Sequence, residues 1–231
     1  MILMLCARGN LVAASASEAT LRPVTIMAVG DSITEGGDSF SSYRPPLAGK
    51  LREAGYQVTF VGSRAGREQP PLAHEGYGGK NTEELARIVP EHFRANPADI
   101  VLLHSGHNHT VEENPVPGIL AATERLIAAF RETNPRVTIL LAQVIPSGKL
   151  PKYSYLPALN TALVTLAARL DRPGERVRLV EIATGFDWQT DTIADHVHPN
   201  AQGAEKMATA WFDALKDVLP PPAPRQGDPV H

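Results

Sequence analysis

The chain has 231 residues, and its 43% hydrophobic, 20% charged and 6% aromatic residues are the composition of a globular protein with a full apolar core. It carries 22 Lys and Arg against 25 Asp and Glu, so the net charge of −3 leaves no basic surplus for a nucleic-acid partner. The single cysteine, Cys6, excludes an internal disulfide and any paired-cysteine zinc site. No run of about 18 apolar residues occurs, so we expect no membrane partner either.

The length favours one domain, which we place at residues 23–219. We expect residues 1–22 to be a flexible N-terminus or a signal remnant, because a short apolar start precedes Ala-Ser-Ala but is interrupted by Arg8 and Asn10. This pattern leaves a secreted and a cytoplasmic protein equally open. Residues 220–231 are rich in proline and predict a disordered tail.

Short β-rich runs alternate with helical patterns between residues 23 and 219, which is typical of a parallel sheet covered by helices on both faces. The expected strands are Val24–Val29, Gln57–Val61, Ile100–His104, Val137–Val144 and Val177–Ile182. The expected helices are Tyr43–Ala54, one beginning near Asn81, Ile119–Thr133, Leu156–Leu170 and Ala201–Val218. We therefore predict an α/β fold, a three-layer α/β/α sandwich around a five-stranded parallel sheet in the flavodoxin-like order 2-1-3-4-5.

The connections that follow the expected strands are long, whereas those that lead from a helix back to a strand are short. In open α/β sheets ligands bind beyond the carboxyl ends of the strands, so the long connections predict where the functional site lies. These connections are Gly30–Ser42, Gly62–Lys80, Ser105–Gly118, Ile145–Tyr155 and Ala183–Asn200.

A candidate nucleophile, Ser32, stands at the end of the first strand in the run GDSIT, just before a helix begins. A serine hydroxyl needs a base to take its proton, and the base needs a third group to orient it. Asp195 and His198 lie three residues apart on the last long connection and can supply both roles. Pro199 favours extended backbone at His198, although His196 remains a competing base.

Acyl transfer also needs hydrogen-bond donors for the oxyanion that forms on the attacked carbonyl. Gly78 and Gly79 can turn a backbone N–H toward Ser32, because glycine tolerates the conformation required. The side-chain amide of Asn108 can reach the same point, and the N–H of Ser32 is a third donor.

Histidines are frequent near Asn108, so a zinc site is an alternative to be weighed. His104, His107 and His109 share one stretch of chain, with His74 on the preceding connection. Strand alternation would aim only some of these rings together, so we predict no metal and no cofactor. The sequon that begins at Asn108 is interpreted as chance, since a glycan there would bury the predicted site.

Four blocks occur in a set order: GDSIT at 30–34, a glycine loop at 76–79, Gly106-x-Asn108 and Asp195-x-x-His198. From about Val24 to Leu219 the chain thereby resembles the SGNH (GDSL-type) hydrolases. It looks most like the branch that contains the carbohydrate esterase family 3 acetylxylan esterases, on the segments Tyr43-Arg44-Pro45, 58–63 and 74–76.

The resemblance implies Ser32 as nucleophile, His198 as base and Asp195 as its partner. It also implies an oxyanion hole made by Ser32, Gly79 and Asn108, with Gly79 preferred to Gly78 by its place in the loop. One departure stands out, because His109 occupies the position after the asparagine where the family usually has aspartate.

We therefore expect a serine esterase that acts on a small-molecule or polysaccharide ester, with acetyl groups on carbohydrate as the substrate that the resemblance implies. Asp31, Tyr77 and His107 are expected to contact the substrate. Two other functions remain: a catalytically weakened carbohydrate-binding relative, and an acyltransferase that uses the same serine. The aromatic residues that could stack on a sugar, or belong to the core, are Tyr43, Tyr77, Phe186 and Trp188.

Overall fold

A computed structural model describes residues 22–172, 174 and 176–222 of the chain. The N-terminal segment predicted at 1–22 lies outside these residues except for Arg22, and the tail predicted at 220–231 lies outside them from residue 223 onward. Within the described ranges, no helix combines the length and the apolar character that crossing a membrane requires.

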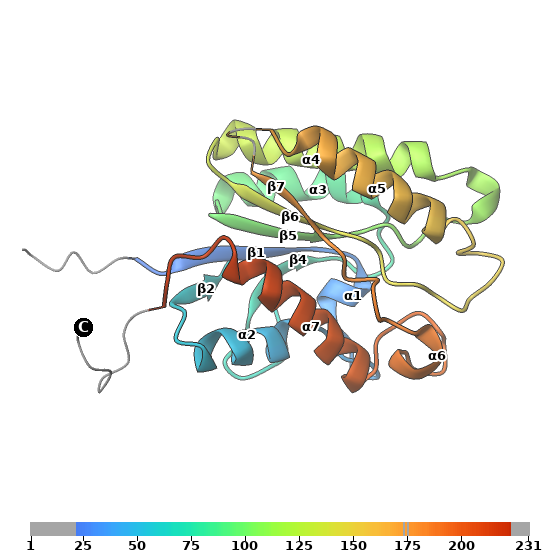
Figure 1. The fold of residues 1–231 in the computed structure, drawn as a ribbon, viewed down its shortest axis with the longest axis horizontal. Helices are drawn as coiled ribbons and strands as arrows, with labels where there is room; N and C mark the ends of the chain where they lie inside the picture. Colours follow the sequence, from blue (N-terminus) through green and yellow to red (C-terminus); the bar gives the residue numbers. More distant parts are fainter. Residues whose placement is uncertain (1–21, 173, 175, 223–231) are drawn as a thin grey trace, which may run out of the picture.

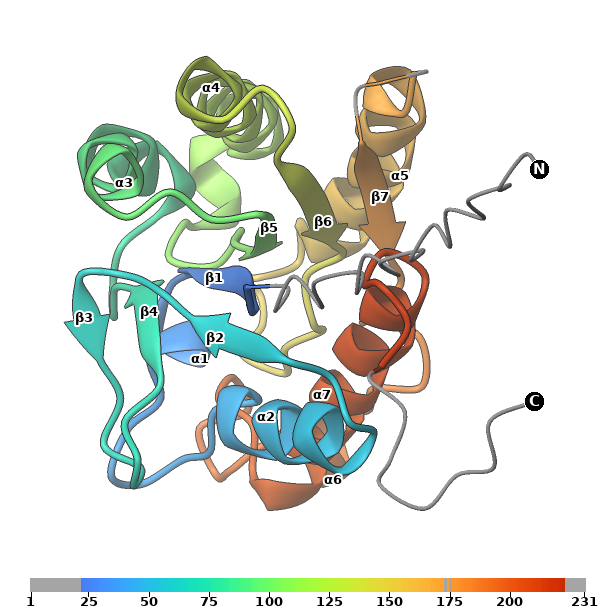
Figure 2. The ribbon, with the colours of Figure 1, turned by 90° about the vertical axis from the view of Figure 1, so that its left-hand side faces the viewer.

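The central sheet is parallel except for one short hairpin, and helices cover both of its faces (Figure 1). Its order is β3-β4-β1-β5-β6-β7, and β2 also pairs with β1. The predicted order is confirmed for the strands foreseen, since β2, β1, β5, β6 and β7 are neighbours in that sequence (Figure 2). The bounds of these strands are Val58–Phe60, Val24–Gly30, Ile100–His104, Thr138–Ala142 and Val177–Val180.

The long helices form two layers, with α3, α4 and α5 on one face of the sheet and α2 and α7 on the other (Figure 1). Helix α3 begins at a capping box between Asn81 and Glu84, and it continues past Pro90. The bounds of α2, α3, α4, α5 and α7 are Arg44–Glu53, Thr82–Ala95, Val116–Thr133, Leu156–Leu170 and Ala201–Lys216.

Alternation along the buried strands fills both cores. In β5, Val101 and Leu103 pack beneath α3 and α4, while Ile100 and Leu102 pack against α2 and α7. Because both faces are buried, these strands are nearly continuous apolar runs. This packing makes β1 and β5 a rigid platform from which the connections at their carboxyl ends project.

The sheet has two strands more than predicted. β3 (Arg64–Ala65) and β4 (Ala73–Gly76) form an antiparallel hairpin inside the connection that follows β2, and β4 pairs in parallel with the end of β1 through Val29 and Gly30. This hairpin brings the glycine loop beside the nucleophile strand. The one-turn helix α1 (Ser32–Glu35) begins at the serine, where the sequence predicted the start of a helix, whereas two short helical segments were not predicted: η1 (Val111–Glu113) and α6 (Trp188–Asp191).

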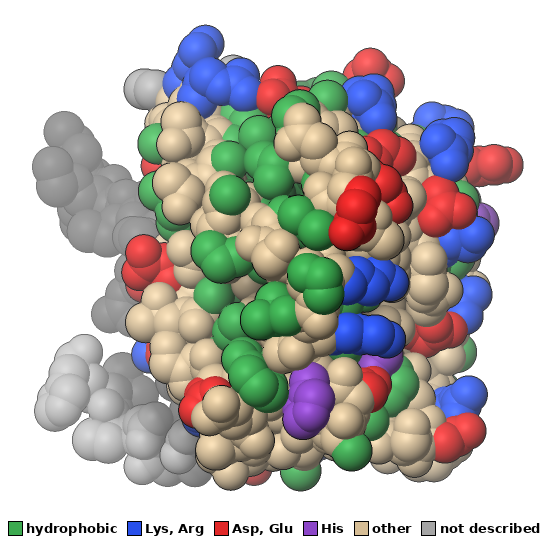
Figure 3. All heavy atoms as spheres, turned by 90° about the vertical axis from the view of Figure 1, so that its right-hand side faces the viewer, with side chains coloured by type: hydrophobic (Ala, Val, Ile, Leu, Met, Phe, Trp, Pro, Cys, Tyr) green, Lys and Arg blue, Asp and Glu red, His purple; other side chains and the backbone are tan. Residues whose placement is uncertain are grey.

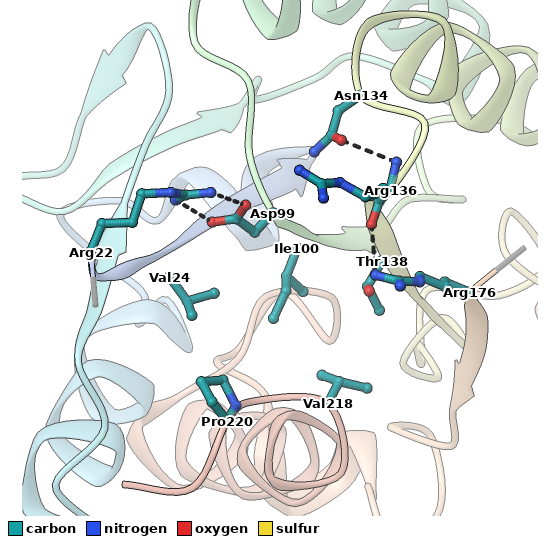
Figure 4. Close-up of a pocket in the computed structure, with 10 residues that line it drawn as sticks. All are labelled: Arg22, Val24, Asp99, Ile100, Asn134, Arg136, Thr138, Arg176, Val218 and Pro220. Carbon is teal, nitrogen blue, oxygen red and sulfur yellow. Dashed lines mark hydrogen bonds and ion pairs between the residues drawn. The ribbon is translucent and has the colours of Figure 1, made fainter. Parts of the chain in front are cut away.

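At the amino ends of the strands, remote from the predicted site, the structure has a cavity of about 450 Å³ (Figure 4). Arg22 and Asp99 form a two-pronged ion pair at its wall, with nitrogen–oxygen distances of 2.8 and 2.6 Å. Arg176 donates to the backbone carbonyl of Arg136 at 3.2 Å. The remaining lining residues are Val24, Ile100, Asn134, Thr138, Val218 and Pro220.

Candidate active site

Ser32 is the first residue of the one-turn helix α1, directly after β1 ends. Asp31 caps this helix, since its Oδ1 accepts from the N–H of Ile33 at 3.0 Å. A Cβ on Gly30 would lie 2.3 Å from the His104 carbonyl oxygen, so glycine is needed where β1 passes into the turn. The tight turn presents the Ser32 hydroxyl at the carboxyl edge of the sheet.

The structure brings the three predicted catalytic residues into one hydrogen-bonded chain. Ser32 Oγ lies 2.8 Å from His198 Nε2, and His198 Nδ1 lies 2.5 Å from Asp195 Oδ2. Partial burial raises the pKa of Asp195, but hydrogen bonds from the His198 ring and from the His198 and Val197 N–H groups outweigh it and leave the pKa below its usual value. An ionised Asp195 only accepts, so Nδ1 carries the hydrogen and Nε2 is free to accept from Ser32.

His196, the competing base, is placed elsewhere. Its ring meets the Trp188 ring edge-on at 5.1 Å, and its backbone has a φ of 57°. Its carbonyl oxygen accepts from Ser147 Oγ at 2.7 Å and from the N–H of Gly148 at 2.9 Å. The left-handed turn at His196 thus points the two neighbouring histidine rings in different directions, and only His198 reaches the serine.

The glycine loop is a turn in which Lys80 N–H donates to the Tyr77 carbonyl at 3.1 Å. Gly79 has a φ of 76° at the third position, as in a type II turn. The N–H of Gly78 is engaged, since it donates to Glu35 Oε2 at 2.6 Å. A Cβ on Gly79 would meet no atom within 4 Å, so this residue borders open space beside the nucleophile. These contacts favour Gly79 over Gly78 as an oxyanion donor.

Asn108 has a φ of 68°, and its Nδ2 donates to the Lys80 carbonyl at 3.0 Å. A side-chain amide carries two hydrogens, so one remains for a ligand. The bond to Lys80 joins the two loops that carry the predicted Gly79 and Asn108 donors.

His109, the departure from the family pattern, lies between two carboxylates. Its Nδ1 is 2.7 Å from Glu113 Oε2, and its Nε2 is 2.9 Å from Glu83 Oε2. Both bonds form together when both ring nitrogens carry hydrogen, and the contact with His109 is the main cause that lowers the pKa of Glu113. His109 therefore ties its loop to η1 and α3.

The structure gives Asp31 and His107 a different place from the predicted one. The two residues are 0% and 2% exposed, so neither side chain faces open solvent where a substrate could contact it. Burial raises the pKa of Asp31 to about 6 and lowers that of His107 well below its usual value. Asp31 Oδ2 lies 3.8 Å from His107 Nδ1. The two side chains that were predicted to contact the substrate are thus buried, and Asp31 Oδ2 and His107 Nδ1 lie too far apart for a hydrogen bond.

Among the described residues, no three His, Cys, Asp or Glu side chains are arranged to hold a metal ion. His104 is buried and accepts from the N–H of Ile145 at 3.3 Å, and His74 accepts from the N–H of Gly76 at 2.9 Å. Burial lowers their pKa values to about 4 and about 3 respectively, so both rings are neutral near pH 7. The absence of a metal and a cofactor stays a prediction.

Of the candidate aromatic contacts, Tyr43 and Phe186 belong to the core. Tyr77 is half-buried at the rim of the site, where its hydroxyl donates to Glu75 at 2.6 Å and the Arg64 guanidinium lies 4.9 Å from the centre of its ring.

Figure 3 shows the face of the molecule at the carboxyl ends of the strands. Hydrophobic side chains form a band across this face, with Lys and Arg on one side of the band.

Two residues of the site were not foreseen. Phe40 stacks on the His198 ring with centroids 4.1 Å apart, and Glu35 binds the glycine loop. Phe40 gave no sequence signal, because the stacking depends on the fold of the connection between α1 and α2. Glu35 gave only a weak sequence signal, because it is an acidic residue three positions after the predicted nucleophile.

The chain is similar to known proteins over most of its length. A model of the GDSL-like lipase/acylhydrolase family matches residues 28–206. A multidomain esterase of Ruminococcus flavefaciens is 26% identical over 89% of this chain, and glutaminase 2 of Bradyrhizobium diazoefficiens is 29% identical over 76%. Each match covers 31% of the relative, so the chain spans about a third of the length of these curated relatives.

Solved structures resemble the whole domain. A carbohydrate esterase family 3 protein from Talaromyces cellulolyticus has a TM-score of 0.76 and 25% identity, with 84% of this chain and 97% of that chain covered. A family 3 carbohydrate esterase from Clostridium thermocellum has a TM-score of 0.73 and 26% identity, with 86% and 100% covered.

Proposed function

The chain belongs to the GDSL-like lipase/acylhydrolase family, and from this membership we propose that it is a serine esterase that removes short acyl groups, acetyl above all, from carbohydrate hydroxyls. The observation that carries the proposal is the hydrogen-bonded chain from Ser32 through His198 to Asp195. A hydroxyl aligned on a base that is itself oriented by a carboxylate is the arrangement that acyl transfer needs.

In the proposed reaction, Ser32 Oγ attacks the ester carbonyl carbon while His198 Nε2 takes the hydroxyl proton. The N–H groups of Ser32 and Gly79 and the amide of Asn108 donate to the oxyanion of the tetrahedral intermediate. Collapse of this intermediate breaks the bond to the alcohol, which receives the proton from His198. Water then attacks the acyl-enzyme while His198 takes its proton, and His198 returns this proton to Ser32 Oγ as the bond to the acyl group breaks and the acid is released.

The charges around the serine support this sequence. When His198 accepts the proton it becomes an imidazolium, which the carboxylate of Asp195 stabilises at 2.5 Å. The Phe40 ring stacked on the other side adds a favourable contact between a cation and an aromatic face.

The substrate class is supported by likeness to the family 3 carbohydrate esterases and to an acetyl esterase mutant whose structure was solved with an acetate ion, at 26% identity and a TM-score of 0.75. At the rim, the Arg64 guanidinium lies over the Tyr77 ring with its side chain 41% exposed, so it can donate hydrogen bonds to the hydroxyl groups of a sugar.

The test is turnover of p-nitrophenyl esters of increasing chain length beside acetate release from acetylated xylan, with Ser32→Ala as control. We expect kcat/KM to fall with chain length, acetate to appear from xylan, and the control to lose on the order of 10⁶ in kcat. Binding of xylan without turnover would indicate a carbohydrate-binding relative. A new sugar ester formed from an added acceptor would indicate an acyltransferase, and a preference for long chains would contradict the acetyl assignment.

A further inference from the structure

Glu35 lies where the nucleophile helix meets the glycine loop. It is the last residue of α1, three positions after Ser32, and its side chain is 29% exposed. Oε2 accepts from the N–H of Gly78 at 2.6 Å, while Oε1 pairs with the Arg64 guanidinium. The carboxylate therefore bridges three segments: α1, the turn at residues 77–80 and the strand β3.

The contact is close enough to depend on a small residue in the turn. A Cβ on Gly78 would lie 2.6 Å from Glu35 Oε2 and 3.8 Å from the Cβ of Ser32. A Cβ on Gly76 would lie 2.4 Å from the backbone nitrogen of Glu35. The loop is thus packed directly against the turn of helix that carries the nucleophile.

The peptide group that Glu35 holds adjoins the proposed oxyanion donor. With its own N–H held by Glu35, Gly78 is anchored on one side, and the bond from Lys80 to Tyr77 closes the turn on the other. The N–H of Gly79 belongs to the peptide between these two anchors, so its direction follows from them. Since the turn otherwise lies on the surface, the bond to Glu35 limits its freedom.

A bare carboxylate close to the oxyanion hole would oppose the negative charge that develops in the transition state. Arg64 compensates this charge through its ion pair with Glu35, and it is held over the ring of Tyr77 at 4.9 Å. The two residues act as one unit: Glu35 supplies the hydrogen-bond acceptor, and Arg64 neutralises the charge that comes with it.

We propose that Glu35 and Arg64 form a positioning pair that fixes the Gly78–Gly79 peptide so that the Gly79 N–H is aimed at the oxyanion. This inference rests on the proposed esterase function. It requires that kcat depend more on the hydrogen-bond acceptor at residue 35 than on the charge of that residue. It also requires that Arg64 affect kcat only while residue 35 is a charged glutamate.

The test is a double-mutant cycle with p-nitrophenyl acetate as the substrate. Each kcat is calculated from the concentration of active sites, which is measured by complete titration with a serine-directed phosphonate. Glu35→Ala should lower kcat by about tenfold with KM little changed, as expected for loss of a hydrogen bond to a charged group. Glu35→Gln, which keeps an acceptor, should recover most of this loss. Arg64→Ala should lower kcat by roughly two- to fivefold alone but by less than about 1.5-fold in the Glu35→Gln background.

Glu124→Ala is the matched control, because it removes an exposed Arg–Glu pair, with Arg169 at 2.6 Å, from α4. The Glu124→Ala variant should leave kcat unchanged. If Glu35→Ala does not fold, Glu35→Asp takes its place in the cycle. The inference is overturned if the Glu35 loss appears in KM alone, if Glu35→Gln is as poor as Glu35→Ala, or if Arg64→Ala costs the same in both backgrounds. An inactive wild type would instead overturn the proposed function.

Discussion

The two edges of the sheet differ in what their polar side chains are bound to. At the carboxyl edge, Ser32 is hydrogen-bonded to His198, which is bonded in turn to Asp195. At the amino edge, a cavity of about 450 Å³ is lined by arginines and Asp99, and the described residues around it include no serine, cysteine or histidine. The difference teaches that a directed chain of hydrogen bonds, rather than cavity volume, distinguishes the proposed reactive site.

The largest loss of activity is expected at the proposed base, His198. His198→Ala should lower kcat on p-nitrophenyl acetate by on the order of 10⁶, because Ser32 then has no group to take its proton. His196→Ala should keep most activity, since that ring packs on Trp188. Thermal melts should show both variants folded, and the opposite ranking of the two activities would assign the base to His196.

The oxyanion side of the same edge should give a smaller effect. Asn108→Ala should lower kcat by roughly 10²–10³ with little change in KM, because the amide is proposed to bind the transition state more strongly than the substrate. Steady-state kinetics on the acetate ester separate the two constants. A loss confined to KM would mean that Asn108 binds the ground state and would contradict this role.

The buried Asp31 carboxyl group should make the free energy of unfolding depend on pH. Burial raises its pKa to about 6, above the value of the unfolded chain, so its favourable contribution is present at low pH and is lost as pH rises through about 6. Asp31→Asn keeps an oxygen that can cap α1 but carries no charge. It should therefore raise the free energy of unfolding by about 1–3 kcal/mol above pH 6, and the gain should vanish near pH 4.

Urea unfolding of Asp31→Asn and wild type between pH 4 and 8 measures this difference. A gain of the same size at every pH would show that the carboxylate charge is not its cause. Equal stability throughout would show that the burial of Asp31 carries no cost in the native protein.

The smallest expected effect lies at the amino edge. Hydrogen bonds from Arg22 and then from Thr25 lower the pKa of Asp99 to about 2, despite partial burial. A lowered pKa means that its stabilising contribution is present above about pH 4 and is lost as pH falls toward 2. Asp99→Ala should cost about 1–2 kcal/mol near neutral pH and leave kcat unchanged. A large loss of kcat in a folded Asp99→Ala protein would break the contrast between the two edges.

The elements that could be predicted are those whose signals are local. Leu156–Leu170 has the predicted bounds, and the capping box at Asn81 marked the start of α3. The β3–β4 hairpin was missed, because Arg64–Ala65 and Ala73–Gly76 are short and polar. Such segments become strands only through their pairing with β1 and with each other.

The same division holds within the candidate site. Ser32, Asp195 and His198 could be named because their chemistry and order are visible in the sequence. The burial of Asp31 and His107 could not be predicted, since it depends on residues far away in the sequence, such as Tyr153, whose ring packs edge-on against His107. The preference for Gly79 over Gly78 came from its place in the loop, and the bond from the Gly78 N–H to Glu35 supports it.

The bond from Asn108 to the Lys80 carbonyl has a consequence for how this site tolerates mutation. It uses a backbone oxygen, so most replacements of the Lys80 side chain preserve the link between the two loops. Proline is the exception, because the N–H of Lys80 closes the turn onto Tyr77. At Gly79, in contrast, a φ of 76° disfavours every residue with a side chain, and asparagine is penalised least. In a saturation library selected for turnover, position 80 should therefore be permissive and position 79 restrictive, although the two residues are adjacent.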